Sequence, residues 1–186
     1  MKRLMRKAGS VCLVAAALGI SFTANDARAV ELQLSAGAAG MATDWRGDGG
    51  ATTTLKIGVR GWDFIAPYFM ARLGYAAVDS RLITLLSVGT QLWGRLGPLR
   101  PYVRIGIAHQ HEEPLAYVGT NPFSAIVGVG DGIRHRAGID SDWTFKQWKK
   151  WSAYLALEGT TTWFTGSSGP SWFWGGGVAL GFNYGF

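Results

Sequence analysis

The side chains in this chain best suited to metal or acid–base chemistry are its three histidines, His109, His111 and His135. His109 and His111 lie two positions apart and are followed directly by Glu112. On a β-strand, side chains two apart share a face, so two imidazoles at this spacing can approach one ion, and a carboxylate can complete the ligand set. His109, His111 and Glu112 are therefore candidate metal ligands. A solvated acidic loop explains the same residues more simply, and we expect no resident metal or other cofactor.

The same histidines permit a catalytic interpretation. Asp131 lies four residues before His135, so an extended segment places both on one face. If this segment pairs with the one that carries His109, then His109, Asp131 and His135 gather on one surface, where an imidazole beside a carboxylate can act as general acid or base. The chain has no nucleophile elbow, zincin motif or Walker motif. We therefore expect no enzymatic activity, and a bulge at Asp131 explains the same residues structurally.

The elements that must hold these residues are strands, because apolar and polar residues alternate with a period of two along the chain after residue 29. The run 102–107, Tyr-Val-Arg-Ile-Gly-Ile, is one example. Eight such segments of about ten residues match the strand length and even strand number of a small membrane barrel. The predicted fold class is all-β: an eight-stranded, antiparallel, up-and-down transmembrane β-barrel.

Alternation alone would also fit a soluble β-sandwich, and the placement of the tryptophans favours the barrel. All nine lie near predicted segment ends or in connections. An up-and-down path gathers them at the two ends of the barrel, as expected for the aromatic girdles that membrane interfaces select. One group is Trp62, Trp93, Trp143, Trp148 and Trp151, and the other is Trp45, Trp163, Trp172 and Trp174.

Charges recur on the polar side of these segments, which is the lumen of a barrel. The interior of an eight-stranded barrel is only wide enough for side chains to fill it, and unpaired charges there are costly. We therefore expect a structural ionic network, with a narrow pore for small solutes as the alternative. The predicted members are Glu31, Lys56, Arg60, Arg72, Arg104, Arg134, Arg136 and Glu158.

The connections between segments are predicted from the breaks in the alternation. If both chain ends lie on the periplasmic side, the outer connections are 42–50, 78–81, 111–125 and 164–171. The inner turns are 61–67, 94–101 and 140–149. The outer connections are longer on average, as in outer-membrane barrels.

Residues 1–29 are typical of a secretory signal peptide. A basic start precedes a short apolar core that ends at Ala27-Arg28-Ala29, and signal peptidases require such a small-x-small pattern. The core is too short to span a bilayer as a helix, and a buried N-terminal helix is the alternative. Without these residues, 18 basic and 12 acidic side chains become 13 and 11, so the net charge of +6 falls to +2. We therefore expect no nucleic-acid partner.

The last segment carries the most specific pattern in the chain. Its alternating residues Val178, Leu180, Phe182, Tyr184 and Phe186 end on an aromatic side chain. Together with the run 100–106, Arg-Pro-Tyr-Val-Arg-Ile-Gly, they resemble the small eight-stranded outer-membrane barrels of the OmpA/OmpX type. The resemblance covers the barrel domain predicted over residues 30–186 and implies that the barrel-assembly machinery reads the terminal pattern.

The resemblance implies a place in the outer membrane of a Gram-negative bacterium, after cleavage near Ala29. It implies outer-membrane lipid and lipopolysaccharide as partners, and a structural or surface-interaction role. A lipid-modifying barrel similar to the outer-membrane lipid A deacylases is an alternative, because those enzymes place a histidine, a serine and an acid on the outer barrel surface. Their His-x-Ser pattern is absent here, since Arg136 and Ala137 follow His135. The sequence leaves the oligomeric state open.

Overall fold

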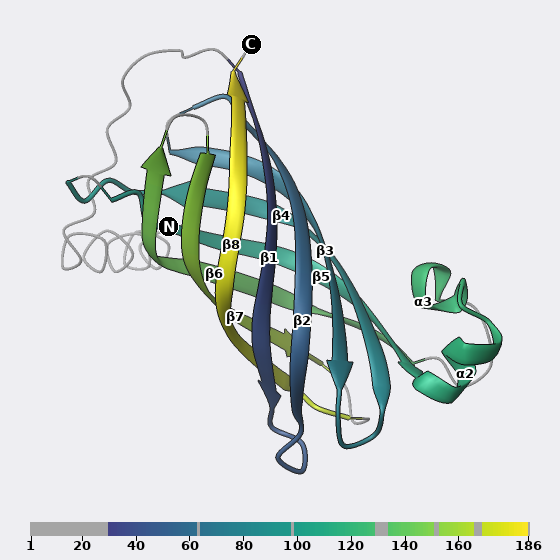
Figure 1. Cartoon of the computed structure of the whole chain (residues 1–186). Helices are drawn as coiled ribbons and strands as arrows, with labels where there is room; N and C mark the ends of the chain where they lie inside the picture. Colours follow the sequence, from purple (N-terminus) through teal and green to yellow (C-terminus); the bar gives the residue numbers. More distant parts are fainter. Residues whose placement is uncertain are drawn as a thin grey trace, which may run out of the picture.

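The computed structural model is a closed barrel of antiparallel β-strands (Figure 1). It describes residues 30–62, 64–97, 99–128, 134–150, 153–165 and 169–185, with the side chains of 145–150 left out. Each strand is hydrogen-bonded to the next in chain order and β8 closes on β1, which confirms the predicted eight-stranded up-and-down barrel. The strands are β1 (Glu31–Thr43), β2 (Gly49–Arg60), β3 (Ile65–Ala76), β4 (Arg81–Trp93), β5 (Tyr102–Pro114), β6 (Arg134–Lys150), β7 (Ala153–Phe164) and β8 (Trp172–Gly185).

The two faces of the barrel wall differ in chemistry. Along β5, Ile105 and Ile107 are 56% and 70% exposed, whereas Arg104, which directly precedes Ile105, is 1% exposed. Large apolar side chains point outward on the other strands as well, and buried polar and charged side chains point inward. Closure gives every strand two hydrogen-bonded neighbours. The wall therefore has no strand edge whose backbone N–H and C=O groups would face an apolar surrounding unpaired.

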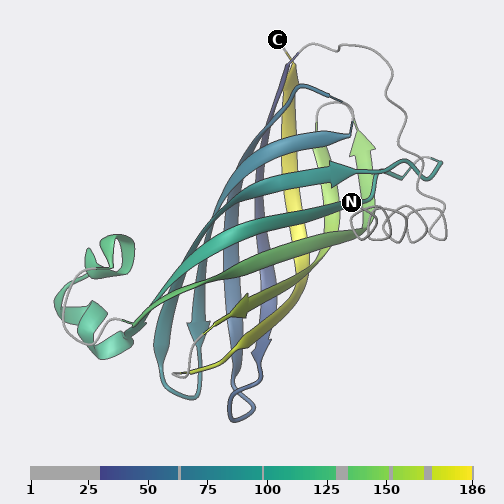
Figure 2. The same cartoon turned by 180° about the vertical axis from the view of Figure 1, so that it is seen from behind.

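The two ends of the barrel are built differently. The start of β1 pairs with the end of β8 at one end, and two short helices stand beside the wall at the other end (Figures 1 and 2). These are α2 (Leu115–Thr120) and α3 (Ser124–Val127), in the connection between β5 and β6. We call its described part, residues 115–128, the β5–β6 loop, and the end that carries it the helical end. Among the described residues, no helix is long and apolar enough to cross a membrane.

Two predicted connections differ most from the structure. The outer connection predicted at 111–125 begins too early, because β5 continues to Pro114. The turn predicted at 140–149 is wrong, because those residues lie within β6. Asp140 and Asp142 gave this segment the polarity of a turn, but both are fully buried strand residues that face the lumen. A β-bulge farther along β6 also interrupts the alternation, so the sequence pattern stops before the strand does.

The tryptophans follow the predicted girdles only in part. At the end opposite the helices, Trp62 is 59% exposed, but Trp93 points into the lumen and packs against Tyr102, with ring centroids 4.8 Å apart. Trp143 lies within β6 rather than in a connection. The helical end carries an outward-facing row in which neighbouring ring centroids are 6.1 and 6.3 Å apart, formed by Trp163, Trp172 and Trp174.

Candidate functional site

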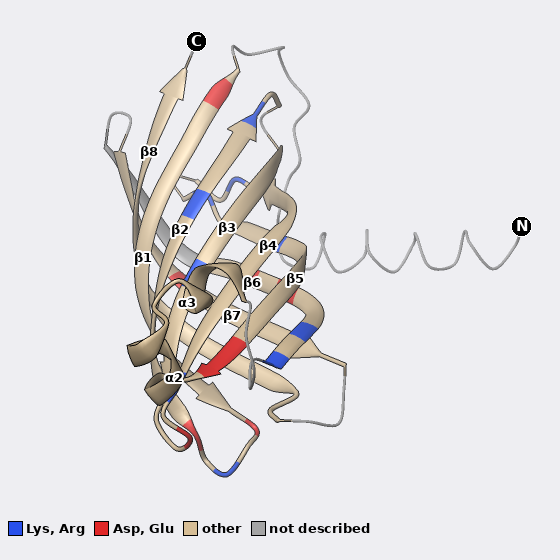
Figure 3. Ribbon diagram, turned by 90° about the vertical axis from the view of Figure 1, so that its right-hand side faces the viewer, with Lys and Arg blue, Asp and Glu red and all other residues tan. Residues whose placement is uncertain are grey.

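A network of ion pairs crosses the middle of the lumen. Arg72 on β3 donates to Asp140 at 3.4 Å and to Asp142 at 3.1 Å, both on β6. Asp142 also pairs with Arg104 of β5, whose guanidinium lies 3.7 Å from Glu158 on β7. Figure 3 shows acidic and basic positions on neighbouring strands along the barrel. Because the two aspartates are completely buried, their charges depend on these guanidinium groups for compensation.

Separate ion pairs lie toward each end of the lumen. At the end opposite the helices, Arg60 of β2 pairs with Glu31 of β1. At the helical end, Glu112 is 1% exposed and receives a further hydrogen bond from Gln110 at 2.8 Å. The carboxylate of Glu112 accepts hydrogen bonds from three arginines, Arg81 at 3.4 Å, Arg134 at 3.3 Å and Arg136 at 3.1 Å.

Amide and aromatic side chains also fill the lumen, and Lys56 contacts two of them. Lys56 donates to Gln91 at 3.1 Å, and its ammonium lies 4.8 Å from the centre of the Tyr102 ring. Toward the helical end, Phe164 and Phe173 meet edge to face with centroids 5.6 Å apart. Amide, aromatic and charged groups therefore interlock across the barrel, as expected for an interior with room only for side chains.

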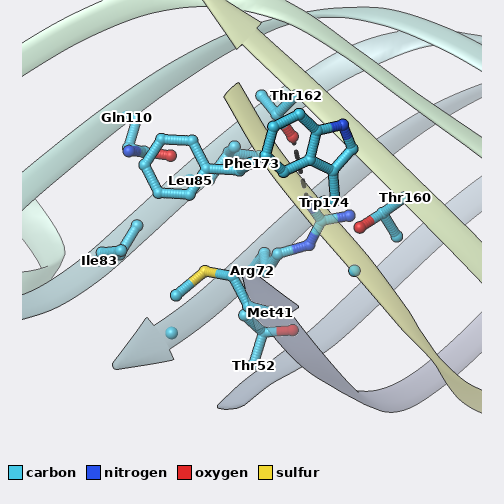
Figure 4. A pocket seen from close by; sticks show the side chains of 12 residues that line it. Met41, Thr52, Arg72, Ile83, Leu85, Gln110, Thr160, Thr162, Phe173 and Trp174 are labelled. Atoms are coloured by element: carbon cyan, nitrogen blue, oxygen red, sulfur yellow. Dashed lines mark hydrogen bonds between the residues drawn. The ribbon is translucent and has the colours of Figure 1, made fainter. Parts of the chain in front are cut away.

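Two cavities inside this packing are small. One lies beside Arg72 and Thr162 and has a volume of about 20 Å³, with side chains crowded around it in Figure 4. Another lies beside Glu158 and Thr160 and has a volume of about 10 Å³. Because one water molecule needs roughly 10–15 Å³, these two spaces admit isolated water molecules rather than a column of water.

The eight charged residues predicted for the lumen all lie at inward positions, in the ion pairs and hydrogen bonds described above. The predicted set omits their acidic partners Asp140 and Asp142, because the predicted turn covers both. Continuing in steps of two from Arg134 and Arg136 would have reached them. Glu112 was grouped with the histidines by proximity in sequence, but its opposite parity turns it toward the arginines of the lumen.

The three histidines meet on the outward face of β5 and β6. His111 pairs directly with His135 across the two strands, and His109 lies two residues away on the same face. The Nδ1 atom of His135 is 3.4 Å from Nε2 of His109. One ring nitrogen from each of the three lies within 4.8 Å of the others. We call His109, His111 and His135 the histidine cluster.

The β5–β6 loop folds back over part of this cluster. Ser124 donates to the Glu113 carboxylate at 2.5 Å, and Thr84 of β4 donates to the carbonyl of Ala125 at 2.7 Å. Gly128 has a left-handed φ of +64° and lies so close to the His111 ring that a Cβ there would overlap it. As a result His111 is only 7% exposed although it faces outward, whereas His109 remains exposed.

Of the predicted catalytic set, the described residues include His109 and His135 but not Asp131. The cross-strand partners of His109 are Leu86 and Ala137, which offer neither a carboxylate nor a hydroxyl. The cluster as described is therefore a group of imidazoles alone.

The predicted assembly pattern lies on the outward face of β8. Val178, Leu180, Phe182 and Tyr184 are 49% to 65% exposed. They form a continuous apolar and aromatic stripe on the strand that closes the barrel. Phe186, like the signal peptide predicted over residues 1–29, lies outside the described residues.

Fold and lumen together define the class: an eight-stranded barrel of the kind found in small outer-membrane proteins. No protein-family model and no curated protein sequence matches the chain. Neisserial surface protein A matches with a TM-score of 0.57 and 10% identity, over 84% of this chain and 97% of its own. The N-terminal barrel domain of Pseudomonas aeruginosa OprF matches with a TM-score of 0.52 and 16% identity, over 82% and 97%.

A further match is the attachment invasion locus protein Ail of Yersinia pestis, solved in complex with the heparin analogue sucrose octasulfate. Its TM-score is 0.54 at 10% identity, over 84% of this chain and 99% of its own. Identities this low establish a shared fold and carry no residue-level correspondence. The lumen network and the histidine cluster are therefore judged from this chain's own geometry.

Proposed function

We propose that this chain is a non-enzymatic outer-membrane barrel protein whose lumen is closed and whose role is structural or surface-interacting. The observation that carries the proposal is the filled lumen. Arg72, Arg104 and their acidic partners bridge the barrel at mid-height, and the cavities beside them have volumes of only about 10 and 20 Å³. A side-chain plug of this kind opposes the flow of hydrated ions.

Placement in an outer membrane is supported by the outward face of the wall. Its strands present large apolar side chains such as Ile107 at 70% and Leu180 at 60% exposure. Exposing these side chains to water is unfavourable, whereas contact with lipid is not. The aromatic row at Trp163, Trp172 and Trp174 suits the height of a membrane interface. The outward stripe on β8 is the surface we assign to the barrel-assembly machinery, and lipid and lipopolysaccharide are the partners of the wall.

A surface-interaction role is supported by the β5–β6 loop. Phe123, Ile126 and Val127 are 74%, 69% and 59% exposed, although the loop is anchored to the wall by Ser124. Exposed apolar groups on an anchored loop are suited to contact with another surface. The solved complex of Ail with a heparin analogue shows a barrel of the same fold holding a ligand.

The experiment that tests this proposal uses the chain refolded in detergent and then in planar lipid bilayers. We expect a band that migrates differently before and after heating, no stable ion conductance, and no release of fatty acid from outer-membrane lipid. Conductance that changes in Arg72→Ala would establish the pore instead. Fatty-acid release that disappears in His135→Ala would establish a lipid-modifying enzyme. A chain that stays soluble without detergent would refute the membrane location.

A further inference from the structure

We propose that the histidine cluster is a binding site for one divalent transition-metal ion, of which Zn²⁺ is the test case, on the outer wall of the barrel. The ligands are His109 and His111 of β5 and His135 of β6. This site is independent of the closed lumen, because all three imidazoles lie on the opposite side of the wall from the ion pairs.

The spacing of the nitrogens fits a tetrahedral ion. Imidazole nitrogens bind Zn²⁺ at about 2.0–2.1 Å, so two nitrogens on a tetrahedral ion lie about 3.3–3.4 Å apart. The distance between Nδ1 of His135 and Nε2 of His109 is 3.4 Å. The third ring is close to both, with centroids 4.6 Å from His109 and 4.7 Å from His135. One ring nitrogen of each histidine lies within 4.8 Å of the other two, so side-chain rotations need only shorten these distances to the tetrahedral spacing.

The backbone brings the ligands together before any ion arrives. His111 and His135 occupy directly opposite positions of the antiparallel ladder, and His109 lies two residues along the same strand face. The strand register, rather than a mobile segment, sets the spacing of the rings. Such preorganisation reduces the entropy that metal binding would otherwise cost.

The burial of His111 supplies a second, independent indication. This side chain is 7% exposed beneath Gly128, and its Nδ1 atom has no hydrogen-bond partner among the described residues. A buried polar atom without a partner is unfavourable, because it has lost its hydrogen bonds to water. Binding a metal through this imidazole would offset that cost, since it gives the ring a strong electrostatic partner.

The ligand chemistry selects the class of metal. Three neutral imidazoles suit Zn²⁺, Cu²⁺ or Ni²⁺, whereas Ca²⁺ and Mg²⁺ require oxygen ligands. Neither nearby carboxylate belongs to the cluster: Glu112 binds arginines inside the lumen, and Glu113 accepts from Ser124. His109 and His135 are exposed, so the fourth position of a tetrahedral ion would open away from the wall.

The test is a zinc titration of the untagged full chain, refolded in detergent without lipopolysaccharide and competed against a chromophoric chelator. The absence of a tag matters because the three cluster histidines are the only histidines in the sequence. We expect one Zn²⁺ per chain. Each single change, His109→Ala, His111→Ala or His135→Ala, should weaken binding at least about tenfold, because even changes behind a metal ligand cost about 10–100-fold.

The matched control is Asp79→Asn, which removes a partly exposed carboxylate outside the cluster and should leave zinc affinity unchanged. Each variant is checked for the heat-dependent gel shift. If the histidine variants fail to refold, the visible spectrum of Co²⁺ on the unaltered chain decides: strong tetrahedral bands support the site. Weak octahedral absorption, absence of zinc binding by the unaltered chain, or binding that survives loss of all three histidines would overturn it.

Discussion

Replacement of Asp142 by alanine is the sharpest test of how the lumen holds the barrel together. The carboxylate of Asp142 is fully buried and faces both Arg72 and Arg104. Without it, Arg72 keeps Asp140 at 3.4 Å and Arg104 keeps Glu158 at 3.7 Å. Removal of one partner from a buried ion pair costs about 3–5 kcal/mol. Since each arginine retains one acid, we expect Asp142→Ala to lower the free energy of unfolding by about 3 kcal/mol.

The assay is urea unfolding of the barrel in lipid vesicles, followed by tryptophan fluorescence and by the heat-dependent gel shift. Asp79→Ala is the control, because its carboxylate lies 3.7 Å from Arg81 and is partly exposed, where an ion pair contributes at most about 1 kcal/mol. A double variant, Arg104→Met with Asp142→Leu, should be destabilised less than the two single changes combined, because it removes both charges of one pair.

A loss below about 1 kcal/mol in Asp142→Ala, equal to that of the control, would refute this reasoning. It would mean that water or rearranged side chains satisfy Arg72 and Arg104, and that the ion pairs are not what stabilises the interior. The proposed closure of the lumen would then have to rest on the aromatic and aliphatic packing alone.

Three further predictions follow from the outer wall. Ile107→Arg, at the middle of β5 and 70% exposed, should cost about 2–4 kcal/mol of stability in vesicles; unchanged stability would mean that lipid does not cover this face. Gly128→Ala should cost about 1 kcal/mol, because φ is +64° there, and should lower zinc affinity by displacing His111. An unaltered zinc affinity would mean that the β5–β6 loop does not influence metal binding by the histidine cluster. Zinc binding should weaken when the solution is acidified, because only unprotonated imidazole can ligate a metal; binding that is insensitive to acidification would point to carboxylates.

The sequence by itself determined the two faces of the wall. A period of two assigns Arg104 to one side and Ile105 to the other whatever the neighbouring strands are, because successive side chains on a strand point in opposite directions. The same rule identifies the inward charges and the outward stripe from Val178 to Tyr184. It also separates Glu112 from His109 and His111, once β5 is known to continue to Pro114.

Only the tertiary structure decided which residues meet across strands. Alternation is unchanged when a strand slides by two residues, so it cannot pair His111 with His135 or bring Asp142 to Arg104. Those contacts come from the register of the closed ladder. The sequence also did not reveal the full length of β6, because the polar residues that face the lumen give this strand the composition of a turn. The histidine cluster therefore exists through strand pairing, although each of its members is visible in the sequence.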